Sequence, residues 1–135
     1  MQTSLYHLQV NIDPANGQFY RDLMGFLGWQ TIYADDNMFG ASGSNGASLW
    51  FVPRMKPSAN DYDGPGVNHL GIGANSAADV DAVVGYLRER GIETLFETPR
   101  HRPEFASDEH ATYYQVMFES PDRVLFEVVY TGPKA

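Results

Sequence analysis

Residues 67–73 of the chain read VNHLGIG, and this stretch decides how the rest of the sequence folds. Strict alternation predicts a strand, with Leu70 and Ile72 on one face and His69 and the two glycines on the other. A near copy, LYHLQVNI, occupies residues 5–12, and His7 again lies opposite the apolar face. The two histidines are 62 positions apart (69 − 7), which indicates an internal repeat.

Helix signals follow both strands at almost the same spacing. Asp13 and Pro14 are typical of a helix start, and Gly28 of a helix end. In the second half Ser76 is the start signal and Gly91 the end signal. The start signals differ by 63 positions (76 − 13) and the stop glycines also by 63 (91 − 28). We therefore predict a duplicated module.

Each module is predicted to have the order β-α-β-β-β. The fold class is α+β, in which two such modules form a curved, cup-shaped mixed sheet around a shared pocket, with the helices outside. We expect one domain made of module one (1–53), a proline- and glycine-rich linker (54–66) and module two (67–135). Further strands are expected near 29–34, 38–41, 48–52, 93–97, 113–119 and 124–130, with a polar loop at 98–111.

Composition narrows the function classes. The chain has 135 residues, 43% hydrophobic content and a net charge of −8, which disfavours nucleic acid as a partner. It has no cysteine, so disulfides, thiolate ligands and cysteine nucleophiles are excluded. No apolar run is long enough for a membrane span and no signal peptide is recognised, so we expect a cytoplasmic protein with no membrane partner.

Three polar side chains on apolar strands need an explanation. Glu127 lies within VLFEVVY (residues 124–130), and burial of an unpaired carboxylate costs several kcal/mol. His7 and His69 occupy equivalent positions of the repeat. A divalent cation would satisfy all three, since two imidazoles and a carboxylate suit iron(II), manganese, zinc, nickel or a similar metal. The alternative is that each histidine is a hydrogen-bonded structural residue.

The chain resembles the vicinal oxygen chelate superfamily, which includes glyoxalase I, extradiol dioxygenases, fosfomycin-resistance proteins and bleomycin-resistance proteins. The resemblance covers nearly the whole chain. It is carried by the YHL at 6–8, the NHLGI at 68–72, and the stretch YYQVMFESPD at 113–122 that leads to LFEV at 125–128. Family members commonly have Asp and Gly where this chain has Ser120 and Arg123.

The resemblance implies that His7, His69 and Glu127 are metal ligands, with Glu127 also a candidate catalytic proton carrier. A fourth family ligand comes from the end of module one, where we match Phe51 to Glu127. Phe51 is not a carboxylate, so the set departs from that of glyoxalase I. It is similar to those of the dioxygenase and fosfomycin-resistance branches. We recognise neither the cation loop nor the phosphonate-binding residues of the latter.

The resemblance favours a metal-dependent enzyme that chelates two neighbouring oxygens of a small molecule, either a glyoxalase-type lyase or isomerase or an extradiol-type dioxygenase. The alternative is a metal-free binding or drug-sequestering protein of the bleomycin-resistance type. Family members often form homodimers, which we also expect here. Other side chains could contact the substrate or move protons; they are Arg100, His101, Arg102, His110, Tyr113, Tyr114, Trp50 and Phe51.

Overall fold

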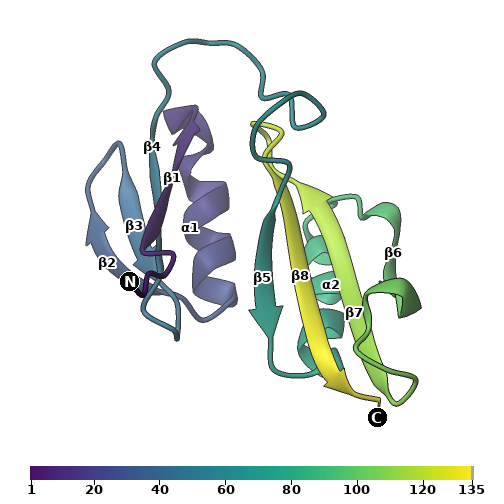
Figure 1. Ribbon diagram of the computed structural model, residues 1–135. Coiled ribbons are helices and arrows are strands. Elements are labelled where there is room, and N and C mark those ends of the chain that lie inside the picture. Colours follow the sequence, from purple (N-terminus) through teal and green to yellow (C-terminus); the bar gives the residue numbers. More distant parts are fainter. Residues whose placement is uncertain (135) are drawn as a thin grey trace. The chain divides into compact units, whose positions relative to one another are not determined.

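The structure, a computed structural model, describes residues 1–134. The chain forms two compact units, Met1–Ala59 and Asn60–Ala135. Each unit has one four-stranded sheet and one long helix in the order β-α-β-β-β (Figure 1). The predicted α+β class and the duplicated module are confirmed. The closure of both modules around one shared pocket stays a prediction.

The first unit has the sheet order β1-β4-β3-β2. Its elements are β1 (His7–Ile12), η1 (Pro14–Asn16), α1 (Gly17–Phe26), β2 (Gln30–Ala34), β3 (Phe39–Ser42) and β4 (Ser48–Pro53). Strands β1 and β4 are parallel, and the other pairs are antiparallel. Fully buried aromatic rings join the helix to the sheet. The ring centroids of Tyr20 on α1 and Phe51 on β4 are 4.7 Å apart, and Phe51 stacks on Phe39 of β3.

The second unit repeats this order as β5-β8-β7-β6. Its elements are β5 (Leu70–Ala74), α2 (Ala77–Glu89), β6 (Leu95–His101), η2 (Pro103–Phe105), β7 (Ala111–Glu119) and β8 (Leu125–Pro133). Helix α2 packs along one face of the sheet (Figure 1). The core between them is apolar, with Val80 and Leu87 of α2 and Val116, Phe118 and Phe126 of the sheet fully buried.

The helix signals in the sequence match the structure, with one refinement. Ser76 caps α2 by accepting a hydrogen bond from the Asp79 N–H at 3.1 Å. Gly28 and Gly91 both adopt positive φ (80° and 67°), as helix-ending glycines do. Asp13 caps the short helix η1, and α1 begins only at Gly17.

The predicted loop at 98–111 is partly regular. Its first residues belong to β6, which runs to His101, and η2 follows. A bulge between Leu95 and Arg100 interrupts the alternation of side chains, which explains why the sequence pattern did not predict that the strand continues to His101. The Thr98 hydroxyl bridges it by donating to the Leu95 carbonyl at 2.6 Å and accepting from the Met117 N–H at 2.9 Å.

Part of the predicted linker packs on the second unit. Tyr62 is 8% exposed and forms a small apolar cluster with Met117 and Leu125. The Tyr62 hydroxyl donates to Glu119 at 2.8 Å, and the Asn60 amide donates to the Arg123 carbonyl at 2.8 Å. This segment therefore covers one end of the sheet face that α2 leaves open. Among the described residues, no helix is long and apolar enough to cross a membrane.

A tyrosine–carboxylate hydrogen bond between β7 and α2 predicts how stability changes at alkaline pH. The Tyr114 hydroxyl donates to Asp81 at 2.6 Å, and this bond, followed by burial and the Asp81 charge, raises the pKa of Tyr114 from 10.0 to about 12. An unfolded tyrosine loses its proton first, so the free energy of unfolding should fall as pH rises from 10.0 to about 12. Asp81→Asn should lower the pKa of Tyr114, measured by ultraviolet titration against Tyr114→Phe.

Candidate functional site

The open face of the second sheet carries the chemistry. Glu127 on β8 pairs with Gly71 on β5 and with Met117 on β7, so these three residues share one face. Neighbouring residues of β8, Phe126 and Val128, point to the opposite face and are buried. The predicted alternation within residues 124–130 is thus correct, and Glu127 alone places a carboxylate among the apolar residues of this strand.

Glu127 is 4% exposed, and donors from β7 satisfy its oxygens. The Tyr113 hydroxyl lies 3.1 Å from Oε1 and 3.0 Å from Oε2. The Gln115 side-chain amide donates to Oε2. Tyr113 and Gln115 are two positions apart on β7 and therefore point to the same side. These hydrogen bonds offset the cost of burying the carboxylate.

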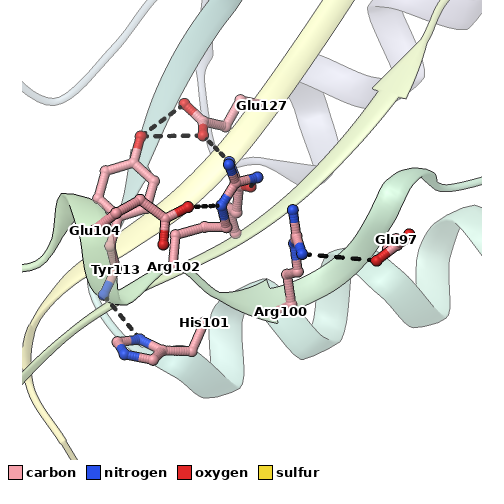
Figure 2. A network of polar contacts seen from close by, with 8 residues as sticks. Glu97, Arg100, His101, Arg102, Glu104, Tyr113 and Glu127 are labelled. Atoms are coloured by element: carbon pink, nitrogen blue, oxygen red, sulfur yellow. Dashed lines mark hydrogen bonds and ion pairs between the residues drawn. The ribbon is translucent and has the colours of Figure 1, made fainter.

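The orientation of the Gln115 amide is fixed from its other end. Arg102 Nη1 donates to Gln115 Oε1 at 3.3 Å, so the amide nitrogen must face Glu127. Arg102 is itself held by Glu104, which accepts from Nε at 2.5 Å. Figure 2 shows this network of Glu104, Arg102, Tyr113 and Glu127. Arg102 thereby acts on Glu127 through Gln115.

His69 meets Glu127 from the start of β5. Its Nε2 lies 3.5 Å from Glu127 Oε1. On the other side of the ring, Nδ1 lies 2.7 Å from Asn68 Oδ1, and the Asn68 amide donates to the Tyr62 carbonyl at 2.9 Å. This second bond makes Asn68 Oδ1 the acceptor, which places the proton of a neutral His69 on Nδ1. The lone pair of Nε2 then faces Glu127.

This donor pair fits a divalent cation. Ligand atoms at about 2.1 Å from a tetrahedral metal are roughly 3.4 Å apart, close to the spacing of His69 Nε2 and Glu127 Oε1. A histidine ligand with its other nitrogen hydrogen-bonded, and a carboxylate ligand with its own donors, are the usual surroundings of a metal site. Within residues 60–134, no third histidine or acidic side chain joins the pair. A complete site needs a further donor, and His7 of the first unit is the candidate from the sequence.

A cavity of about 890 Å³ opens over this face. His69, Glu127, Tyr113 and Gln115 line it. Further lining residues are Tyr62, Asp63, Asn68, Phe96, Glu97, Arg100, Arg102, Phe105, Met117 and Leu125. The cavity lies within the second unit and offers both apolar walls and two arginines to a small molecule.

Tyr113 is perturbed by its place beside Glu127. Burial, followed by the Glu127 charge and the hydrogen bond to Glu127, raises the pKa of Tyr113 to about 12. Arg102 acts in the opposite direction. Tyr113 therefore keeps its proton at neutral pH and serves as a donor toward Glu127. It was predicted as a substrate-binding residue, and its position in the cavity is compatible with that role.

The two remaining histidines lie away from the cavity. His101 pairs with Tyr114, the residue that bonds to α2, so it belongs to the helix-facing side of the sheet. Its Nδ1 accepts from the Tyr113 N–H at 3.3 Å (Figure 2). The same Nδ1 lies 2.6 Å from Thr112 Oγ1. The side chain of His110 is 88% exposed and pairs with Glu109. Neither lines the cavity, so substrate contact through His101 has no support in this geometry.

The counterpart of Glu127 in the first unit is Trp50, one residue from the predicted Phe51. Trp50 pairs with Gln9, two positions after His7, and Glu127 pairs with Gly71, two positions after His69. Phe51 instead occupies the helix-facing position and is 0% exposed. It is a core side chain and presents no surface to a ligand. The fourth ligand position is thus tryptophan, which packs across Gly40.

Three residues of the site were not singled out from the sequence: Asn68, Gly71 and Gln115. Gln115 shares strand alternation with Tyr113, which was a usable signal. Asn68 directly precedes the histidine, but no pattern distinguishes an orienting amide from a turn residue. Gly71 is informative only once the register is known, because a Cβ there would lie 3.2 Å from Glu127 Oε1.

Gly71 provides a test of the geometry. In Gly71→Ala the new methyl group would crowd Glu127, which Tyr113 and Gln115 prevent from moving freely. We expect metal affinity to fall about tenfold, as for disturbed outer partners of metal ligands. Gly73→Ala on the same strand is the matched control, since no described heavy atom would come within 4 Å of the added methyl group. Isothermal titration with Zn²⁺ would compare them, and equal affinities would refute the crowding argument.

Two βαβββ modules and a histidine–glutamate pair on the open face of a sheet define a class of small α+β proteins that bind ligands over that face. The chain belongs to the Glyoxalase/Bleomycin resistance protein/Dioxygenase superfamily, whose family model matches residues 5–128. The resemblance drawn from the sequence is therefore confirmed. No curated protein sequence matches the chain significantly.

Solved structures agree with this assignment. A candidate glyoxalase from Bacillus halodurans is 27% identical, with a TM-score of 0.78 and 96% of each chain covered. The lactoylglutathione lyase of Agrobacterium tumefaciens is 16% identical, with a TM-score of 0.67 and coverage of 96% of this chain and 95% of that one. The fosfomycin resistance protein FosX of Listeria monocytogenes is 18% identical, with a TM-score of 0.67 and coverage of 96% and 92%. The last two show the fold alone.

Proposed function

We propose that this protein is a metal-dependent enzyme that binds a small oxygen-rich molecule through two neighbouring oxygens. His69 and Glu127 would hold a divalent cation, with His7 as the third ligand. Iron(II), manganese, zinc and nickel are the candidate ions. The observation that carries this proposal is the approach of His69 Nε2 to Glu127 Oε1 at 3.5 Å.

The surroundings of the pair support the proposal. An imidazole and a carboxylate could form a simple ion pair, but here other side chains orient both groups through hydrogen bonds. Asn68 holds Nδ1 of His69, and Gln115 and Tyr113 hold Glu127. Such outer partners fix the atoms that face a metal and are typical of ligand residues. A surface ion pair needs none of them.

The roles of the side chains follow from their contacts. When bound, a divalent cation polarises substrate oxygens and stabilises negative charge that develops on them. Glu127 is the candidate catalytic residue, and Oε1, the oxygen that faces His69, would hold a proton only when it is not bound to the cation. Tyr113 donates to both oxygens of Glu127 and compensates charge there. Arg102 and Gln115 position Glu127, and the apolar walls exclude water.

Two reaction types remain within this proposal, a glyoxalase-type lyase or isomerase and an extradiol-type dioxygenase. The likeness to the lyase from Agrobacterium tumefaciens is one of fold and does not decide between the two. Tryptophan at the fourth ligand position separates the chain from the four-ligand glyoxalase set that the resemblance implies. The other function class is a metal-free drug-binding protein of the bleomycin-resistance type. Such a protein does not require the hydrogen bond by which Asn68 orients His69.

Elemental analysis is the direct test. The full chain, purified without chelators, should contain about one equivalent of a transition metal, and apoprotein should take up one equivalent of Fe²⁺, Mn²⁺, Ni²⁺ or Zn²⁺. Catechols, thiol adducts of 2-oxoaldehydes, and fosfomycin form the substrate panel. Oxygen uptake with a catechol would identify a dioxygenase, and loss of the thiol adduct a lyase. Metal uptake by His7→Ala shows whether the first unit supplies a ligand.

A different result would support the alternative class. If the purified chain contains no metal, takes up none on titration, and still binds a small molecule, the metal-dependent proposal fails. Location in the cytoplasm and assembly into a homodimer stay predictions. Sedimentation velocity of the full chain would measure the second.

A further inference from the structure

The two arginines that line the cavity have different partners. Arg102 is held by Glu104, by Gln115 and by the ring of Phe105, whose centroid lies 5.1 Å from the guanidinium carbon. Within residues 1–134, Arg100 has one ion pair, with Glu97 at 3.7 Å. Among the described residues, buried Nε of Arg100 has no hydrogen-bond partner. Arg100 therefore keeps terminal donors for a further partner, and Figure 2 shows its ion pair with Glu97.

The present partner of Arg100 is easily displaced. The Glu97 side chain is 88% exposed, and exposed ion pairs contribute little to stability. A guanidinium presents its donors in a fixed planar fork that matches a carboxylate or phosphonate. The Arg100 side chain is 41% exposed although its Nε is buried, so an incoming anion could use the terminal nitrogens, while Glu97 turns out to solvent. The cavity lining carries the carboxylates Asp63, Glu97 and Glu127 beside Arg100 and Arg102, so the attraction for an anion is confined to the guanidinium of Arg100 and is not a property of the whole cavity.

Two phenyl rings expose apolar surface in the same cavity. Phe96 is 50% exposed and Phe105 58% exposed, and both line it together with Met117 and Leu125. Phe96 and the next residue, Glu97, adopt left-handed backbone conformations (φ 56° and 59°), which bulky residues rarely do. Strain of this kind persists where the surrounding fold imposes it, often at ligand sites. Here it keeps a ring at the cavity beside Arg100.

We propose that Arg100 binds an anionic group of the substrate, and that the substrate is an organic anion with a flat apolar body that lies against Phe96 and Phe105. This inference rests on the proposed function only in assigning the chelating oxygens to the His69–Glu127 end of the cavity. The anionic group then lies at the β6 end. A neutral polyol or a fully apolar molecule would leave Arg100 unmatched and is not the expected ligand.

The first experiment uses metal-free full-length protein, benzoate and benzyl alcohol. The two probes share a phenyl ring and differ in charge. Titrations followed by NMR should show tighter binding of benzoate. Arg100→Gln should weaken benzoate binding about tenfold and leave benzyl alcohol unchanged, because only the charge-assisted hydrogen bonds are lost. Phe96→Ala should weaken both probes, and Glu97→Gln should not weaken benzoate.

Equal benzoate affinity in Arg100→Gln and in the wild type would overturn the proposal, as would a preference for benzyl alcohol. A second pair of probes separates this result from the proposed function. With Zn²⁺ present, 3,4-dihydroxybenzoate should bind more tightly than catechol, and Arg100→Gln should remove that difference. If Zn²⁺ fails to bind, the metal-dependent function fails while the benzoate result still stands or falls alone.

Discussion

Replacement of Glu127 by glutamine should lower the affinity of the protein for a divalent cation by at least about 100-fold. Loss of an outer partner of a ligand already costs roughly 10–100-fold, and Glu127 is the proposed ligand itself. The amide is the same size as the carboxylate but lacks its charge. It also turns one NH₂ group toward either Gln115 or the metal position, and both faces require an acceptor. Equilibrium dialysis with Zn²⁺ followed by elemental analysis would measure the change.

Glu97→Gln is the matched control, because Glu97 lines the same cavity but its side chain is 88% exposed and forms an ion pair with Arg100. Its metal affinity should equal that of the wild type. Far-ultraviolet circular dichroism should show that both variants keep the fold. If Glu127→Gln binds metal as tightly as Glu97→Gln does, Glu127 is a structural carboxylate and the assignment of the site is incorrect.

The fold could be predicted from the sequence because the repeat consists of residues that determine local backbone structure. Asp13, Ser76, Gly28 and Gly91 mark helix ends by simple local physics, and a common offset links them. The prediction that the strand near 93–97 ends before residue 98 was wrong, because a longer-range contact determines the structure there. The bulge in β6 is bridged by Thr98 to Met117, a partner 19 positions away, and no local pattern signals that bond.

The site was predictable only in part, and strand parity explains the difference. Glu127 was found because a carboxylate stands out in an apolar strand, and His69 because its position repeats. Phe51 was matched instead of Trp50 because residues 48–52 are nearly all apolar and offer no alternation. A shift of one residue moves a side chain to the other face of a sheet. The face on which His101 lies likewise depends on its pairing with Tyr114, which the sequence does not reveal.

Asn68 and Gln115 belong to a different category. Amides of this kind are common on loops and strands, and their role depends on which atom each one faces. Gln115 can donate to Glu127 because Arg102 occupies its oxygen. Asn68 can accept from His69 because the Tyr62 carbonyl occupies its nitrogen. These arrangements join segments distant in sequence, and only three-dimensional placement reveals them.

Phe51→Ala should lower the free energy of unfolding by about 3–5 kcal/mol, the usual cost of removing a fully buried phenyl ring. Phe51 is 0% exposed and contacts Tyr20 and Phe39, so truncation leaves a cavity between α1 and the sheet. Phe51→Leu leaves a smaller cavity and should cost less than Phe51→Ala. Ile32→Ala, at a side chain 51% exposed on β2, is the control and should change stability by about 0.5 kcal/mol or less. Urea unfolding followed by circular dichroism measures all three.

A substrate-contacting phenylalanine at position 51 would give the opposite pattern, with near-normal stability and weakened ligand binding. That outcome would mean that Phe51, and not Trp50, corresponds to Glu127 in the first unit.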